Sequence, residues 1–192
     1  MSRPCRDAAR PPARERVEAA FWELLSERPY REITIAALAR RAQVNHNTFY
    51  YHFTSLADLA GQQVDRTLTP RVPQVLISAL ASGAVDLRQL DADPEFLTNF
   101  RRICLLVGPH STPWIIDQVR DSALQVWYSW IGREPDDLNT SERAQLAFIL
   151  GGMLAILGDQ TTNGAPATLE SLVHTELGKA VATTFTRLRR SG

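Results

Sequence analysis

Residues 45–52, with the sequence NHNTFYYH, combine polar and aromatic side chains in a way that suits binding to nucleic acid. Asn, His, Thr and Tyr form hydrogen bonds with base edges and phosphates, and this stretch has no negative charge that would repel phosphate. Phe49 and Phe53 lie four residues apart, as on one face of a helix, and we expect that face to point at the core. The opposite face would then present the polar residues His46, Asn47, Thr48, Tyr50, Tyr51 and His52.

Three short helices would position this stretch. Thr34 can cap one helix, whose apolar residues recur at helical spacing over 35–42, and Asn45 can cap the next. The residues between them, 43–44, form the bend. An amphipathic helix over 17–25 precedes the pair and would cover both with its apolar stripe. The pattern predicts a three-helix unit with a helix-turn-helix of the kind that reads DNA.

Over roughly residues 14–59 the sequence resembles the N-terminal domain of the TetR family (TetR/AcrR-like) of bacterial transcription regulators. The residues that stand at recurrent positions of the family are Thr34, Ala39, Ala42, Val44, Thr48, Tyr50, His52, Phe53 and Leu59. The resemblance implies a dimeric, ligand-responsive regulator. Such a repressor binds a palindromic operator in double-stranded DNA and releases it when a small molecule binds the C-terminal domain.

The resemblance also implies which side chains touch DNA. The residues expected at base edges are Asn45, His46, Asn47 and Tyr51, and those expected at phosphates are Thr34, Thr48, Tyr50 and His52. A structural role for the last two, such as a ring packed on the first helix of the pair, is the alternative. Arginines at positions 3, 6 and 10 form a basic arm that either contacts the minor groove or phosphates, or is a solvated tail.

Two departures from the family pattern bear on mechanism. Gln43 stands in the turn where the family usually has glycine, so either it adopts a left-handed conformation or the turn takes another geometry. Leu56 stands at the start of the fourth helix where the family often has lysine, so an ammonium contact with phosphate is missing. Backbone amides after Thr54 or Ser55 could still hold a phosphate there. We expect the fold to be kept and the detail of the turn to differ.

Length and composition fit a globular protein of two parts. The chain has 192 residues, of which 44% are hydrophobic, enough for a small N-terminal unit and a second domain with its own core. No run of eighteen apolar residues predicts a membrane span, and the first sixteen residues lack the apolar core of a signal peptide, so we expect a cytoplasmic protein. Cys5 and Cys104 are too few and too far apart to indicate a disulfide framework or a CxxC metal site.

The net charge of zero conceals an asymmetry. Up to His52 the chain has nine arginines and six acidic residues, whereas the remainder has twelve basic and fifteen acidic residues. A basic N-terminal part joined to an acidic remainder fits a DNA-binding head on a body that does not bind DNA. A difference this small could also arise by chance.

Helix caps and stop signals, with no alternating strand pattern of useful length, predict an all-α chain. Beyond the head, the helices are expected at about 55–68, 72–81, 93–108, 112–132, 139–161 and 168–190. We therefore divide the chain into a flexible basic arm at 1–13, a helix-turn-helix DNA-binding domain at 14–60 and a helical effector-binding and dimerisation domain at 61–192.

The last two helices are predicted to form the dimer interface. On the first of them, residues at helical spacing share a face on which small side chains allow close approach: Ala147, Leu150, Gly151, Leu154, Ala155 and Gly158. The final helix has a comparable stripe that includes Val173, Leu177, Val181 and Leu188. The resemblance implies a four-helix bundle with a second subunit. The alternative is that both faces pack inside one subunit.

Aromatic residues between positions 72 and 132 are candidates for an effector pocket. Together with two possible polar anchors, the candidates are Phe96, Phe100, His110, Trp114, Asp117, Trp127 and Trp130. Such a lining would suit a flat or apolar small molecule. Ordinary core packing is the alternative for each of them.

Other functions find little support in the sequence. It has no HExxH, P-loop, GxGxxG or GxSxG motif, and its four histidines are not at metal-ligand spacing, so we expect no enzyme, no cofactor and no metal. A helical module that uses its helix-turn-helix to dock protein is the remaining alternative. A protein-docking face should be more apolar than the one predicted here.

Overall fold

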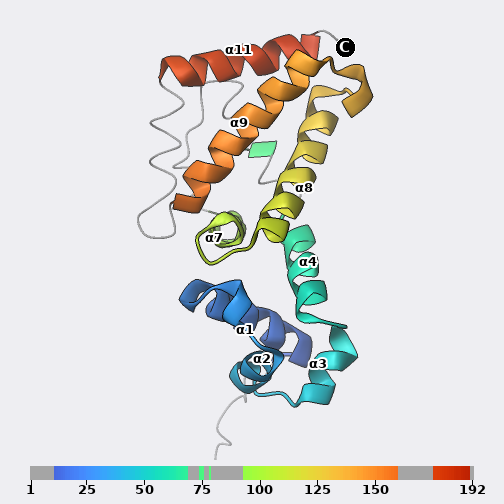
Figure 1. Cartoon of the computed structure of the whole chain (residues 1–192), viewed down its shortest axis with the longest axis vertical. Helices are drawn as coiled ribbons and strands as arrows, with labels where there is room; N and C mark the ends of the chain where they lie inside the picture. The colour runs from blue at the N-terminus through green and yellow to red at the C-terminus, as the bar shows by residue number, and fades with distance from the viewer. Residues whose placement is uncertain (1–10, 69–73, 76–77, 79–92, 160–174, 191–192) are drawn as a thin grey trace, which may run out of the picture. The chain divides into compact units, whose positions relative to one another are not determined.

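The computed structural model describes residues 11–68, 74–75, 78, 93–159 and 175–190, and these are helical with no strand among them, which confirms the predicted all-α fold (Figure 1). The α-helices are α1 (Ala13–Glu27), α2 (Ile35–Ala42), α3 (His46–His52), α4 (Leu56–Thr67), α7 (Pro94–Val107), α8 (Pro113–Ile131), α9 (Thr140–Asp159) and α11 (Glu176–Arg190). No helix within the described residues is long and apolar enough to cross a bilayer. The helix predicted over 72–81 falls mostly outside the described residues.

The chain divides into two compact units, residues 1–60 and 61–192, with the boundary inside α4. In the first unit α1 packs against α2 and α3, and α2 also packs against α3. Its core includes fully buried side chains from α1 to α4 and from the residue that follows α3: Val17, Phe21, Leu25, Leu38, Phe49, Phe53 and Leu59. The apolar stripe predicted on α1 therefore covers the other two helices, as expected from its spacing.

The helices of the second unit begin where local caps dictate. The carboxylate of Asp93 accepts from the amides of Glu95 and Phe96 at the start of α7, and Asn139 and Glu142 exchange side-chain and backbone hydrogen bonds at the start of α9. Both caps follow the sequence prediction. Thr112 precedes α8 as predicted, but its side chain makes no capping hydrogen bond.

The final helix starts later than the sequence suggested. The hydroxyl of Thr175 accepts from the Gly178 amide at 3.2 Å, and α11 begins at Glu176. The predicted start near residue 168 lies outside the described residues.

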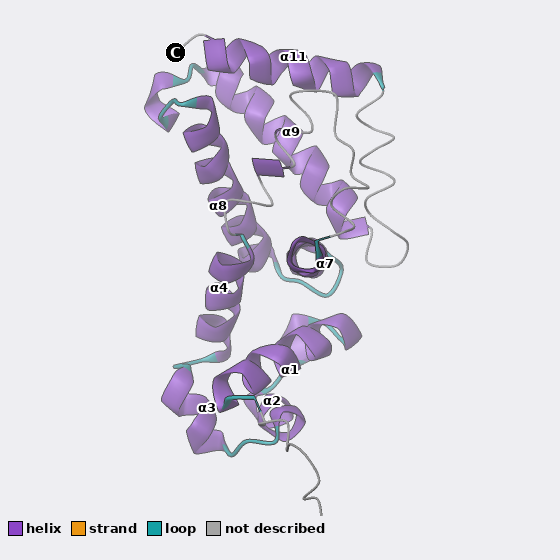
Figure 2. Ribbon diagram, turned by 180° about the vertical axis from the view of Figure 1, so that it is seen from behind, coloured by secondary structure: helices purple, strands orange, loops and turns teal. Residues whose placement is uncertain are grey.

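The core of the second unit is built from α7, α8, α9 and α11, with α7 packed on α8 and α9 (Figure 2). Trp127 of α8 is buried with its ring edge against Phe185 of α11, at 5.1 Å between centroids. Gly158 lets α9 approach the end of α7, because a Cβ at this position would overlap the carbonyl of Val107. Two of these residues were predicted for other sites, Trp127 for an effector pocket and Gly158 for the dimer interface.

Candidate nucleic-acid interface

Local hydrogen bonds fix both ends of α2. The Thr34 hydroxyl accepts from the Ala37 amide at 3.1 Å, which confirms the predicted cap. At the other end, the Gln43 amide donates to Arg40 and the Val44 amide donates to the Ala39 carbonyl at 2.9 Å. This is the pattern of a Schellman motif, in which the residue after the helix is left-handed.

Gln43 adopts that left-handed conformation, with φ 53° and ψ 50°. Of the two geometries left open by the sequence, the turn therefore keeps the one that glycine would favour. A side chain other than glycine costs free energy in this region, on the order of 1 kcal/mol. The departure at position 43 changes the cost of the turn and leaves its path intact.

Asn45 begins the recognition helix, α3. Its side-chain oxygen accepts from the Thr48 amide at 2.7 Å and from the Thr48 hydroxyl at 2.9 Å, which confirms the predicted N-cap. Phe49 and Phe53 are buried, with ring centroids 5.6 Å apart, and face the core as their spacing predicted. The guanidinium of Arg14 lies 5.4 Å from the centre of the Phe53 ring. Two buried rings therefore hold α3 against the rest of the first unit.

Apart from Thr34, which caps α2, the predicted contact residues lie at the start of α3 or on its side that faces away from this core. The exposed ones are Thr34, Asn45, His46, Asn47, Tyr50 and Tyr51, and the half-buried ones are Thr48 and His52. Tyr51 is 85% exposed and Tyr50 is 54% exposed. The Tyr50 ring meets Phe49 edge-on at 5.5 Å, and His52 meets Tyr51 at 4.9 Å. Six of the eight predicted side chains are thus accessible, and the other two are partly so.

The start of α4 differs from the sequence-based expectation. The Asp58 carboxylate accepts from both the amide and the hydroxyl of Thr54, at 2.7 and 3.1 Å, and the Asp58 amide donates to Ser55. A carboxylate, that of Asp58, therefore lies two residues after Leu56 at the start of α4. This carboxylate accepts from the Thr54 amide, just before the amides that the sequence offered to a phosphate, and its negative charge makes the helix start a poor phosphate site.

Two arginines of the first unit are paired with carboxylates of the same unit. Arg41 donates two hydrogen bonds to the Glu27 carboxylate, both at 2.8 Å, and a third to Glu23. The hydrogen bonding with Arg41 is the main cause that lowers the pKa of the Glu27 carboxyl. Arg14 pairs with Glu18 at 3.0 Å. These cations are neutralised within the unit, a distinction that the sequence-based charge count could not make.

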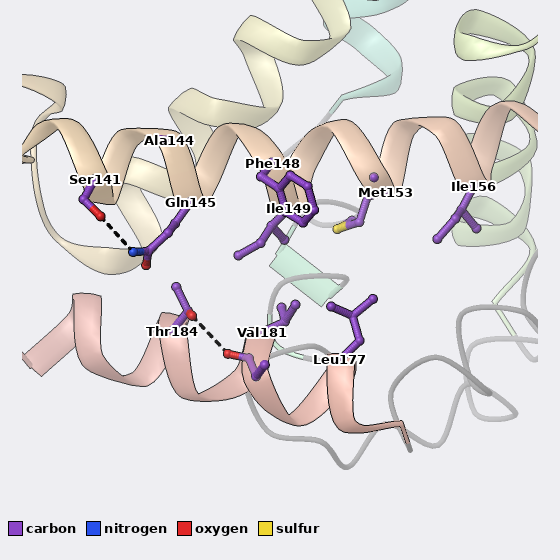
Figure 3. A pocket seen from close by; sticks show the side chains of 12 residues that line it. Ser141, Ala144, Gln145, Phe148, Ile149, Met153, Ile156, Leu177, Val181 and Thr184 are labelled. Carbon is purple, nitrogen blue, oxygen red and sulfur yellow. Dashed lines mark hydrogen bonds between the residues drawn. The ribbon is translucent and has the colours of Figure 1, made fainter.

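The second unit contains an exposed apolar groove between α9 and α11 (Figure 3). Ile149 and Ile156 from α9 and Leu177 and Val181 from α11 extend into it. Phe148 also lines the groove and is 77% exposed, and Leu177 is 54% exposed. Side chains this large and apolar are usually covered in a functional assembly.

The predicted dimer stripe on α9 is divided by the structure. Ala147, Gly151 and Ala155 are exposed, whereas Leu150, Leu154 and Gly158 are buried within the second unit. On α11, Leu177 is exposed, Val181 is only 9% exposed and Leu188 is fully buried, and Val173 lies outside the described residues. The predicted stripe does not include Phe148, which is exposed on the same helix. The leucines face inward because α7 and α8 pack on that side of α9.

The aromatic residues predicted to line an effector pocket are divided in the same way. Phe96, Phe100 and Trp127 are buried core residues, and the first two stack on each other at 6.0 Å. The other candidates, His110, Trp114 and Trp130, are half-buried, and exposed Asp117 pairs with Arg120 at 2.7 Å. None of these residues lines the groove between α9 and α11. Core packing therefore accounts for three of the seven candidates, Phe96, Phe100 and Trp127.

The geometry of the first unit defines a helix-turn-helix regulator, and comparison with known proteins agrees. Residues 18–62 match the family described as "Bacterial regulatory proteins, tetR family". An "Uncharacterized HTH-type transcriptional regulator" of Haemophilus influenzae is 29% identical over 94 residues, which covers 47% of this chain and 46% of that protein. The chain thus spans about half the length of this relative.

Residues 18–62 thus match the N-terminal domain of the TetR family of bacterial transcription regulators, as the sequence pattern indicated. The match of this domain favours a transcription regulator over an enzyme.

Proposed function

We propose that this regulator is a dimeric repressor, which binds a near-palindromic operator through α3 of each subunit and releases it when a small molecule binds the second unit. The observation that carries the proposal is the two-sided nature of α3. One side is anchored by the buried rings of Phe49 and Phe53, and the other presents accessible hydrogen-bonding side chains. A rigid helix with such a face suits the major groove.

The exposed residues at the start and middle of α3 are the proposed base contacts: Asn45, His46, Asn47 and Tyr51. Since the Asn45 side-chain oxygen is used in the cap, its amide nitrogen is the group that we assign to DNA. Asn47 is exposed and suits the paired hydrogen bonds that adenine offers, worth about 1–3 kcal/mol of discrimination. The proposed phosphate contacts are Thr34, Thr48, Tyr50 and His52.

For the dimer, we propose that the groove between α9 and α11 packs against the same surface of a second subunit. Phe148 and Leu177 supply the exposed apolar surface that such an interface would bury. The exposed small residues Ala147, Gly151 and Ala155 lie on the same helix as Phe148 and permit close approach of another helix. One recognition helix reads too few bases to be selective, so pairing is what would give the regulator its specificity.

For the response to an effector, we propose that binding in the second unit shifts α4, which begins at Leu56, four residues after α3 ends at His52. The shift would change the spacing of the two recognition helices, which must match major grooves roughly 34 Å apart. A hundredfold loss of operator affinity needs a coupling free energy of only about 2.7 kcal/mol. The effector and the operator must then weaken each other reciprocally, and an effector that bound free and operator-loaded protein equally would refute this part.

The experiment measures binding to the DNA upstream of the protein's own gene by mobility shift and footprinting, at a fixed salt concentration. Wild type is compared with Asn47→Ala and Tyr50→Ala, and with Ser26→Ala as the control, because Ser26 is exposed on α1 and is none of the proposed DNA contacts. The proposal predicts protection of a near-palindrome that is lost in the two α3 variants and kept in the control. Weak, salt-sensitive binding to any DNA, equal in all four proteins, would contradict it and favour protein docking by α3.

A further inference from the structure

Arg16 of α1 contacts the turn between the two helices of the helix-turn-helix. Its Nη1 donates to the carbonyl of Ala42 at 2.8 Å and to the carbonyl of Gln43 at 3.0 Å. These carbonyls lie 26 and 27 residues further along the chain, at the point where α2 ends. The last carbonyls of a helix lack partners within the helix and carry partial negative charge, so a guanidinium is well suited to bind them.

The same turn contains an unfavourable backbone conformation. Gln43 is the one residue other than glycine with a positive φ in the part of the chain that the structure describes. Only Gln43, Val44 and the cap residue Asn45 separate α2 from α3. The direction in which α3 leaves the turn therefore depends on the dihedral angles of Gln43, and the carbonyl that Arg16 binds belongs to that residue.

The remaining contacts of Arg16 show that its guanidinium is placed for the turn. Its Nε is buried and has no hydrogen-bond partner among the described residues. A buried donor without a partner costs stability, about 1–3 kcal/mol. By contrast, Arg41 uses both ends of its guanidinium on the exposed carboxylates of Glu23 and Glu27. The guanidinium of Arg16 thus leaves its Nε without a hydrogen bond, while its Nη1 donates to two carbonyls of a single turn.

We propose that Arg16 is a positioning residue for DNA recognition: it clamps the left-handed turn at Gln43 and thereby sets the direction of α3. The proposal rests on the proposed function, because it assumes that α3 reads the operator. Arg16 itself does not touch DNA in this scheme. Its effect passes through the carbonyls of Ala42 and Gln43.

The test compares three single variants, Arg16→Met, Arg16→Lys and Gln43→Gly, with a double variant that combines Arg16→Met and Gln43→Gly. Loss of hydrogen bonds to a charged group predicts that Arg16→Met lowers operator affinity about tenfold or more, measured where circular dichroism shows the variant fully folded. Arg16→Lys keeps a cation that can reach the carbonyls, so its operator affinity should lie between those of wild type and Arg16→Met. Glycine adopts the left-handed conformation without a clamp, so in the Gln43→Gly background the same Arg16→Met change should cost less than about threefold.

Two further readouts separate positioning from simple stability or direct contact. Arg16→Met should weaken binding to operator but not to unrelated DNA, and should leave the slope of log affinity against log salt unchanged, because no phosphate contact is lost. Arg31→Met, which removes the same charge from an exposed site in the same unit, is the matched control. Hydrogen exchange at the Val44 amide, which bonds to Ala39, should quicken in Arg16→Met and not in Arg31→Met.

The proposal is overturned if folded Arg16→Met binds operator like wild type, if Gln43→Gly does not reduce the effect, or if the salt slope falls as for a phosphate contact. Failure of wild type to bind any operator would instead refute the proposed function. The exchange rate at Val44 then decides the clamp by itself: faster exchange supports it and an unchanged rate overturns it. Should Arg16→Met not fold, Arg16→Lys gives the same exchange measurement with a smaller expected change.

Discussion

Four large hydrophobic side chains are exposed among the residues that the structure describes, and they fall into two pairs. Tyr50 and Tyr51 lie on α3 of the first unit, whereas Phe148 and Leu177 lie on α9 and α11 of the second. The first pair ends in hydroxyl groups and stands among polar neighbours on α3. The second pair has no polar side-chain atom and borders an apolar groove.

This difference separates two kinds of partner. A surface that combines aromatic rings with hydrogen-bonding groups can bind bases and phosphates, which are themselves polar. An apolar groove gains free energy only when another apolar surface covers it. In the proposed function, recognition and association therefore use surfaces in different units, so a substitution can remove one surface and leave the side chains of the other in place.

The largest expected effect concerns the support behind the DNA-facing surface. Phe49 is fully buried and Tyr51 is 85% exposed on the same short helix. Phe49→Ala should lower the free energy of unfolding by about 3–5 kcal/mol, because it leaves a cavity in the core. Tyr51→Ala should change it by less than about 0.5 kcal/mol. Denaturant titration measures both, and equal losses would show that the two sides of α3 are not distinct.

The next effect concerns the apolar pair. Phe148→Asp places a charge in the proposed interface and should weaken the dimer by a hundredfold or more, about 2.7 kcal/mol. Phe148→Leu, which keeps an apolar side chain, is the control and should remain a dimer. Sedimentation equilibrium gives the dissociation constants. A dimer unaffected by the aspartate would assign association to another surface.

A smaller effect tests what the tyrosine hydroxyl adds. Tyr51→Phe removes the hydroxyl group, so that this side chain becomes apolar like Phe148. It should weaken the free energy of operator binding by about 0.5–1.5 kcal/mol through the loss of a hydrogen bond. Its unfolding should match wild type because the side chain is exposed. Fluorescence anisotropy with a labelled operator measures the change. Unaltered affinity would mean that only the ring of Tyr51 is used.

The smallest effect is a pH dependence at the start of α9. The Asn139 backbone amide and the Arg133 guanidinium hold the pKa of Glu142 below its ordinary 4.5. A lowered folded-state pKa gives stability that is present above the unfolded pKa and is lost as the pH falls through the folded value. Wild type should therefore melt higher than Glu142→Gln at about pH 7, and the gap should close as the pH falls through the lowered pKa of Glu142 in the folded state. A gap that persists in acid would contradict this account.

The sequence predicted best those features that depend on a few neighbouring residues. The caps at Thr34, Asn45, Asp93 and Asn139 involve residues two or three positions apart, so their chemistry can be read locally. The side of α3 that is buried could be read for the same reason, because Phe49 and Phe53 lie one turn apart.

Features that depend on packing between distant helices were predicted less well. Helical spacing grouped Leu150 with Gly151 on one stripe, yet α7 and α8 bury the leucine and leave the glycine exposed. Likewise, aromatic composition could not tell the buried Trp127 from a pocket residue. Whether a side chain lies in a core, a pocket or an interface depends on elements far away in sequence, which periodicity along one helix does not specify.

The central claim is that two copies of α3 read one operator while the apolar groove holds the subunits together. The most direct measurement is a footprint titration of wild type and Phe148→Asp on the same operator. We predict that wild type protects two half-sites about one helical turn apart, both at the same protein concentration, and that Phe148→Asp loses both together. Protection of a single half-site, equal in the two proteins, would contradict the claim.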